Sequence, residues 1–177
     1  EIRDVETAQI AVQASLTGHL VLSTVHTNSA VAAIARPKDM GVEAYLLAST
    51  LTGIVAQRLV RRLCTHCREE YEPDPSELEL LGLAANTDAR LYRPAGCPKC
   101  KQTGYEGRTG IYELIVVDDA LRRLIHDDAR EADMAGHAFD VRKTLFENGV
   151  ELVLDGIQEL SFQKAVQIEM ALMHPQH

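Results

Sequence analysis

The stretches "RRLCTHCREEYEPD", residues 61–74, and "AGCPKCKQTGYEGRTGIYELIVVDD", residues 95–119, contain every cysteine of the chain. The four are Cys64, Cys67, Cys97 and Cys100. Each stretch holds one C-x2-C unit, which places two thiolates on one tight turn. Two such units brought together make a tetrahedral sulfur site of the kind that Zn²⁺ accepts. The sequence therefore predicts a structural zinc site with the four cysteines as ligands.

Other uses of the cysteines stay open on chemistry alone. Two disulfides would suit a secreted protein, but the chain begins with the charged "EIRDVE" and shows no secretory signal. A thioredoxin-like dithiol needs one CxxC unit, whereas an iron–sulfur cluster accepts four thiolates. His66 lies inside the first unit and is a spacer if four thiolates complete the shell. Such a shell leaves no position for water, which predicts a structural role.

The region around the cysteines, residues 64–117, is rich in Cys, Gly, Pro and charge. We expect only short strands there, at 90–93 and 110–116, with Gly96 and Gly104 relieving backbone strain beside the second unit. A loop-rich region with few apolar runs needs another source of stability, and a bound metal couples its binding to folding.

Upstream, residues 4–17 predict an amphipathic helix with Asp4 as its N-cap. The apolar run "HLVLSTV", residues 19–25, predicts a buried strand. Thr24, His26 and Thr27 then fall at or near the carboxyl end of that strand, where α/β sheets bind ligands. The alternative is that these polar side chains only cap the next helix.

Further helices are predicted on both sides of the cysteine region. One begins at Asn28 or Ser29 and ends before Pro37, and another spans residues 42–63. Three more follow from Asp118 onward, in "DDALRRLIHDD", "DVRKTLFENGVELVLDG" and "SFQKAVQIEMALM". Asp119 and Ser161 are their candidate starters, and Gly149 is either a break or a residue inside a helix.

The composition excludes several classes of protein. The chain has 177 residues, 46% of them apolar, and a net charge of −8. An acidic chain without interleaved aromatic residues is a poor nucleic-acid binder, so a nucleic-acid-binding zinc ribbon is disfavoured. A local basic cluster, made of Arg58, Arg61, Arg62 and Arg68, is interpreted as a solvated face. No apolar run approaches the roughly 20 residues of a membrane span, so we expect no direct membrane insertion. The chain has no initiator Met, and we expect it to be part of a longer protein.

Several motifs together resemble the secretion-ATPase family, the hexameric motors of type II secretion and type IV pilus assembly. They are "EIRDVETA", "LTGHLVLSTVHTN", "AQRLVRRLC", "GCPKC" and "GYEGRTGIYEL". The first is similar to the end of the family's Walker B motif, and the second to its histidine box. "VVDDALRRLIHD" favours the type II secretion branch.

The resemblance implies an α/β fold: the C-terminal portion of a RecA-like P-loop NTPase with a tetracysteine zinc ribbon and a C-terminal helical subdomain. The implied division is residues 1–62, 63–117 and 118–177. It also implies a homo-hexamer that uses ATP and Mg²⁺. Such a motor works in the bacterial cytoplasm, peripheral to the inner membrane and against secretion platform proteins.

The resemblance also implies roles for individual residues. Glu1 orients the attacking water, Arg3 is a nearby basic position that helps hold phosphate or the acidic motif, and His26 senses the γ-phosphate. The residues associated with the nucleotide more loosely are His19, Thr24 and Arg58. A core histidine is the alternative for His19, and a structural salt bridge is the alternative for Arg58.

One part of such an enzyme is missing from these residues. No G-x-x-x-x-G-K-[ST] loop occurs in the chain, so nothing in it cradles the phosphates. We therefore expect the isolated chain to be inactive as an ATPase. A function of a different class is the alternative: a zinc-stabilised interaction module that docks to a secretion or pilus membrane platform.

Overall fold

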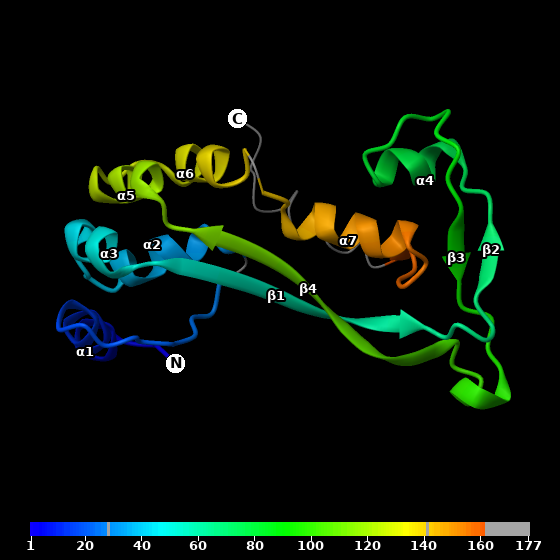
Figure 1. Cartoon of the computed structure of the whole chain (residues 1–177), viewed down its shortest axis with the longest axis horizontal. Coiled ribbons are helices and arrows are strands. Elements are labelled where there is room, and N and C mark those ends of the chain that lie inside the picture. The colour runs from blue at the N-terminus through cyan, green and yellow to red at the C-terminus, as the bar shows by residue number, and fades with distance from the viewer. Residues whose placement is uncertain (28, 141, 162–177) are drawn as a thin grey trace. The chain divides into compact units, whose positions relative to one another are not determined.

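The computed structural model divides the chain into two compact units, and Figure 1 shows its helices and strands. The described residues are 1–27, 29–140 and 142–161. The first unit comprises Glu1–Ala56 and Glu113–Lys143, and the second comprises Gln57–Tyr112 and Thr144–His177. The three-part division predicted from the sequence follows motifs and not contacts, and it stays a prediction.

The first unit is built from short helices around an aliphatic core. Its helices are α1 (Val5–Leu16), α2 (Ala32–Asp39), α3 (Ala44–Thr50), α5 (Asp119–His126) and α6 (Glu131–Ala138). Ile34, Leu47, Ile115, Leu121 and Ile125 are among its most buried side chains. Because the core is aliphatic, its stability comes mainly from removing this surface from water.

Helix α1 begins where the sequence predicts. Asp4 is the N-cap, and its side chain accepts a hydrogen bond of 2.8 Å from the backbone amide of Thr7. Ala8 and Val12, four residues apart, are the buried positions of the helix. The capping residue satisfies a donor that the helix itself leaves unpaired, and this prediction is confirmed.

The predicted helix over residues 42–63 is wrong. The chain instead forms α3, which ends at Thr50, and then strand β1 (Gly53–Leu63). The run "TLTGIV" explains the change, because β-branched residues and a glycine disfavour helix. Gly53 also suits a close strand contact, since a Cβ there would lie 3.2 Å from the Ile115 carbonyl oxygen. β1 is hydrogen-bonded to β4 (Tyr105–Val116), which runs in the opposite direction (Figure 1).

The predicted buried strand over residues 19–25 is also wrong. This segment has no regular secondary structure, and Leu20 and Leu22 are 81% and 86% exposed. A strand requires a hydrogen-bonded neighbour. In this segment Thr24 accepts a backbone hydrogen bond from Ile2 N at 2.9 Å, and His19 N donates one to the Ala14 carbonyl oxygen at 3.1 Å. These two bonds do not form a strand ladder.

Pro37 does not end the helix before it, as the sequence predicts. It lies inside α2, which continues to Asp39. A proline inside a helix removes one backbone hydrogen bond, but α2 buries Ala33 and Ile34 in the core, and that burial offsets the loss. Ser29 does help to start this helix, because its Oγ accepts from Ala32 N at 3.0 Å. Asn28 lies outside the described residues.

The second unit carries the cysteines on turns between short elements. These are β2 (Glu69–Tyr71), α4 (Pro75–Leu80), β3 (Leu91–Arg93), the 3-10 turn η1 (Pro98–Cys100) and α7 (Leu145–Leu154). β2 and β3 pair antiparallel, with Glu69 opposite Arg93. Leu81, Leu91 and Val153 belong to a separate small core. The predicted strand at 90–93 is confirmed as β3, which begins one residue later. The predicted strand at 110–116 is confirmed as the end of β4, which begins five residues earlier than predicted.

The C-terminal predictions hold in part. α5 and α7 are present, with Gly149 inside α7, and the N-cap of α5 is Asp118, one residue before the predicted starter. Apart from Ser161, the predicted helix "SFQKAVQIEMALM" lies outside the described residues. In the part of the chain that the structure describes, no helix is long and apolar enough to cross a membrane.

Candidate metal centre and the Glu1–His26 edge

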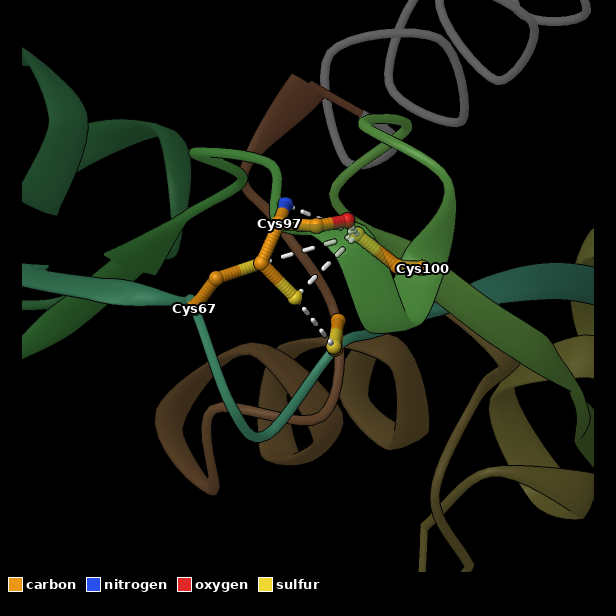
Figure 2. Close-up of side chains that lie close together, drawn as sticks. Cys67, Cys97 and Cys100 are labelled. Atoms are coloured by element: carbon orange, nitrogen blue, oxygen red, sulfur yellow. Dashed lines mark hydrogen bonds between the residues drawn. The ribbon is translucent and has the colours of Figure 1, made fainter.

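The four cysteines come together in the second unit, with their ligand atoms all within 4.8 Å of one another. The Sγ–Sγ distances are 4.0 Å for Cys64–Cys97, 3.8 Å for Cys67–Cys100 and 3.7 Å for Cys97–Cys100. Figure 2 shows the sulfurs of Cys67, Cys97 and Cys100 turned toward a common point. All four thiols are free. The predicted grouping is therefore present in the structure.

These distances fit one tetrahedral metal ion. Four sulfurs at about 2.3 Å from Zn²⁺ form a tetrahedron with edges of about 3.8 Å. The measured 3.7–4.0 Å lies around that value and is nearly twice the ~2.05 Å of a disulfide bond. An iron–sulfur cluster would spread its cysteine ligands over several iron atoms, whereas these sulfurs converge on one point.

Backbone amides support the sulfurs. Cys100 Sγ accepts from Cys97 N and from Gly104 N, both at 3.2 Å, and Cys67 Sγ accepts from Gly96 N at 3.3 Å. The chain turns tightly enough to do this because Gly96 and Gly104 have φ values of +109° and +77°, in the region that glycine enters without strain. Such outer donors orient ligands and stabilise their charge.

The two thiols of the Cys67–Cys100 pair ionise differently. Burial, followed by the neighbouring thiols, raises the pKa of Cys67 to about 12. Burial also disfavours the Cys100 thiolate, but the amides of Cys97 and Gly104 and the thiols of Cys97 and Cys67 lower its pKa to about 6. Without a cation Cys100 therefore ionises more readily than Cys67, and a bound dication would supply the positive charge that stabilises both as thiolates.

A second group of ligand atoms, from Cys64, His66 and Glu106, also lies within 4.8 Å. His66 and Glu106 are exposed, and Lys99 Nζ lies 2.9 Å from His66 Nε2. An ammonium group at this nitrogen occupies its lone pair and repels a cation. The tetracysteine set is therefore the better metal site of the two.

In the first unit, the predicted catalytic residues Glu1, Arg3 and His26 contact one another, and we call this group the Glu1–His26 edge. Glu1 Oε2 lies 2.5 Å from an Arg3 guanidinium nitrogen, and Glu1 Oε1 lies 2.7 Å from His26 Nε2. The hydrogen bond from Arg3 keeps the pKa of Glu1 below its usual range, so its carboxylate is charged at neutral pH. The His26 side chain is 86% exposed and so faces solvent on its other sides.

The three more loosely associated residues are placed differently. Thr24 contributes its backbone carbonyl to the bond with Ile2 N, and its side chain is exposed. His19 Nδ1 lies 3.2 Å from the Ala14 carbonyl oxygen and 3.1 Å from Thr17 Oγ1, at the C-terminal end of α1. Arg58 lies half-buried on β1, in the second unit.

Glu113 is a buried acidic residue that the sequence analysis missed. It lies on β4, is 6% exposed, and accepts a hydrogen bond of 3.2 Å from Ala30 N. The signal was present in "IYELI", because alternation in a strand puts Glu113 on the face of Ile111 and Ile115. A carboxylate on an otherwise apolar strand face indicates a specific partner.

Comparison with known proteins identifies the family to which the chain belongs. The model of the family described as "Type II/IV secretion system protein" matches residues 1–167, and the chain belongs to this family. The fold is similar to that of the pilus retraction motor PilT with bound ADP, at a TM-score of 0.62 and 23% identity over 94% of this chain and 37% of that one. The Legionella pneumophila ATPase DotB gives the same TM-score at 16% identity, over 95% of this chain and 37% of its own.

Relatives in sequence come from type II secretion. The chain is 53% identical to the type II secretion system ATPase E of Vibrio cholerae over 160 residues, which are 90% of this chain and 32% of the relative. It is 54% identical to the type II secretion system protein E of Pseudomonas aeruginosa over 157 residues, 89% of this chain and 31% of the relative. The chain thus spans about a third of the length of these relatives, and the resemblance to the type II branch is confirmed.

Proposed function

We propose that this chain is part of a cytoplasmic, homo-hexameric ATPase that powers pseudopilus assembly for type II protein secretion. In this proposal the ATPase binds platform proteins of the bacterial inner membrane. The observation that carries the proposal is the contact of Glu1 with both Arg3 and His26, in a chain about half identical to type II secretion proteins. In phosphoryl transfer, a charged carboxylate can orient the attacking water, and a neighbouring guanidinium and imidazole can interact with the phosphate.

Each residue of the edge has a distinct task in this proposal. Glu1 orients the attacking water and accepts its hydrogen bond, and Arg3 keeps that carboxylate charged and in place. His26 turns its exposed ring to the γ-phosphate when nucleotide is bound. Mg²⁺, which arrives with ATP, neutralises phosphate charge.

The looser positions act around this centre. The Thr24 carbonyl joins the segment before His26 to the backbone of Ile2, and His19 supports the end of α1. Arg58 faces the nucleotide side in the assembled enzyme. These three residues shape the site without contacting the reacting atoms.

The metal site has a structural task in the same enzyme. We propose that Cys64, Cys67, Cys97 and Cys100 hold one Zn²⁺, which joins the end of β1 to the turn before β4. Its four thiolates close the coordination shell, so the ion takes no part in hydrolysis. Because the 177 residues contain no G-x-x-x-x-G-K-[ST] loop, the isolated chain is expected not to hydrolyse ATP.

The test uses the full-length protein that carries these residues. We expect purified wild-type protein to hydrolyse ATP, and Glu1→Gln to lower kcat about 10²-fold or more while ATP still binds. Phosphate release measures the rate, and a fluorescent ATP analogue measures binding. Glu131→Gln is the matched control, because it neutralises an exposed carboxylate on α6 in the same unit.

Two results would contradict the proposal. One is hydrolysis by Glu1→Gln at the wild-type rate, which would remove Glu1 from the chemistry. The other is a folded, zinc-loaded full-length protein with no ATPase activity under any condition, together with tight binding to a platform protein. That second result would favour the docking module.

A further inference from the structure

Glu113 stands out in the first unit as a charged residue in an aliphatic environment. Its side chain lies on the same strand face as Ile111 and Ile115, which are 1% and 0% exposed. A buried carboxylate is strongly unfavourable unless it is paired. We therefore expect the Glu113 carboxylate to accept hydrogen bonds from groups buried beside it.

The partner that the structure shows is the backbone at the start of α2. Ala30 N donates to Glu113 Oε1 at 3.2 Å across 83 residues of sequence, and Ala30 and Val31 are 1% and 2% exposed. Ala30 lies two residues before the first helical residue, Ala32, and a buried backbone amide outside the helix needs an acceptor. A carboxylate is therefore well suited to this position.

The segment held in this way carries His26. On the other side of His26 the Thr24 carbonyl accepts from Ile2 N at 2.9 Å, so Thr24 and Ala30 each have a fixed backbone contact. Thr27 Oγ1 also bonds the Ser29 carbonyl at 3.0 Å within the segment. Because the His26 side chain is 86% exposed, the path of its backbone sets where its ring lies.

We propose that Glu113 is a positioning residue for His26: its buried carboxylate fixes the start of α2 and thereby holds the imidazole against Glu1. This role rests on the proposed function for its effect on hydrolysis, but the placement of His26 is a property of the chain itself. Glu113 touches no reacting atom, and its proposed effect on His26 passes through Ala30.

The catalytic test compares two substitutions in the full-length protein. Glu113→Ala removes the acceptor, and we expect kcat to fall about tenfold with the KM for ATP changed less than about twofold, because orientation and not binding is lost. Glu113→Gln keeps an amide oxygen that accepts from Ala30 N, so it should recover most of the rate. Glu131→Ala, on the exposed face of α6, is the control and should match wild type.

A second test does not depend on hydrolysis. In the same proteins, we expect Glu113→Ala to speed hydrogen exchange in a peptide covering residues 24–34 and to move the NMR signals of the His26 ring. Glu113→Gln should change both much less, and the ring signals of His137, which bonds Asp118, should stay in place in each variant. These readouts also serve if the wild-type protein proves inactive, a result that would overturn the proposed function alone.

The inference is overturned if Glu113→Ala leaves the His26 signals and the exchange of residues 24–34 as in wild type. It is also overturned if Glu113→Ala and Glu113→Gln lower kcat equally while both stay folded, because the hydrogen bond to Ala30 would then not be what matters.

Discussion

The cysteine cluster and the Glu1–His26 edge differ in how many contacts each site receives from the chain around it. Cys100 receives amide hydrogen bonds from Cys97 and Gly104, residues within four positions of it. His26, by contrast, has a side chain that is 86% exposed, and its recorded polar contact is with Glu1. The cysteine cluster is closed by two C-x2-C turns, whereas the Glu1–His26 edge leaves the imidazole facing solvent.

That difference has a physical origin. A C-x2-C turn fixes both of its sulfurs within one bend of chain, so two turns make a complete tetrahedral shell. Phosphate binding instead needs a row of backbone amides from a glycine-rich loop. In the proposed function, the Glu1–His26 edge therefore supplies only charge and orientation, because the 177 residues lack that loop. Perturbing each region should therefore give effects of different size.

Removing the metal should have the largest effect. We expect about one Zn²⁺ per chain, and we expect Cys100→Ser or a strong chelator to abolish binding and unfold the second unit, since apparent zinc binding energies reach about 10–16 kcal/mol. Elemental analysis measures the metal, and hydrogen exchange reports each unit separately. His66→Ala is the control and should keep its zinc. Unchanged exchange around the cysteines after complete metal loss would contradict a structural role.

The next largest effect is expected at Gly104. A Cβ there would lie 2.4 Å from Pro94 Cβ, at a φ of +77°. Gly104→Ala should cost about 1–3 kcal/mol from backbone strain alone, with the clash added, and should weaken metal affinity because Gly104 N donates to Cys100 Sγ. Denaturant unfolding and competition with a zinc indicator measure the two effects.

Gly82 separates strain from clash in this experiment. It has a similar φ of +72°, with nothing within 4 Å of the position of a Cβ. Gly82→Ala should therefore show the backbone term without loss of zinc affinity. Equal zinc affinities for the two variants would mean that Gly104 matters only for its backbone conformation.

The sequence predicted the metal site more fully than the strands. Each C-x2-C unit fixes two ligands locally, and two matched units indicate one four-sulfur site even though Cys64 and Cys97 are 33 positions apart. The segments at 19–25 and 42–63 were misassigned because apolar runs look alike in helices and buried strands. Whether Gly53–Leu63 forms a strand depends on β4, which lies about fifty residues further along the chain, and no local pattern contains that information.

The residues of the Glu1–His26 edge were predicted from the family resemblance, and only part of their arrangement follows from that resemblance. The pairing of Glu1 with Arg3 is local, since they are two residues apart. The anchoring of Ala30 by Glu113 joins residues 83 positions apart and could be seen only in the structure. Motifs thus identified Glu1, Arg3 and His26 as candidates, whereas a contact between residues far apart in sequence, such as Glu113 with Ala30, has no local signal.

A smaller effect is expected at Tyr105, which links the cysteine region to the chain after α7. Its hydroxyl bonds Glu159, and the Arg61 guanidinium lies 3.8 Å from its ring centre. Tyr105→Phe should destabilise the second unit by about 0.5–1.5 kcal/mol. Arg61 would still stack on the phenyl ring, so the loss isolates the hydroxyl. A variant as stable as wild type in urea unfolding would contradict this link.

The pH dependence of Tyr105 provides a check. Burial, followed by the hydrogen bond to Glu159, raises its pKa to about 12. A raised pKa means that the stabilisation is fully present below the unfolded value of about 10 and is lost as the pH rises toward 12. The difference in Tm between wild type and Tyr105→Phe should therefore shrink in that window and stay constant between pH 6 and 9.

The smallest effect is expected at Asp118, an exposed N-cap of the first unit. Hydrogen bonds from the Leu121 amide and then from His137 hold the pKa of Asp118 below its usual value. A depressed pKa contributes stability above the unfolded pKa, and that stability is lost as the pH falls through the native value. Asp118→Asn keeps a capping side chain but removes the charge, so its Tm should lie slightly below wild type at pH 7 and converge with it in acid. His137→Ala should remove only the share that depends on the imidazole. A difference between wild type and Asp118→Asn that persists unchanged to pH 2 would show that cap geometry, and not charge, carries the effect.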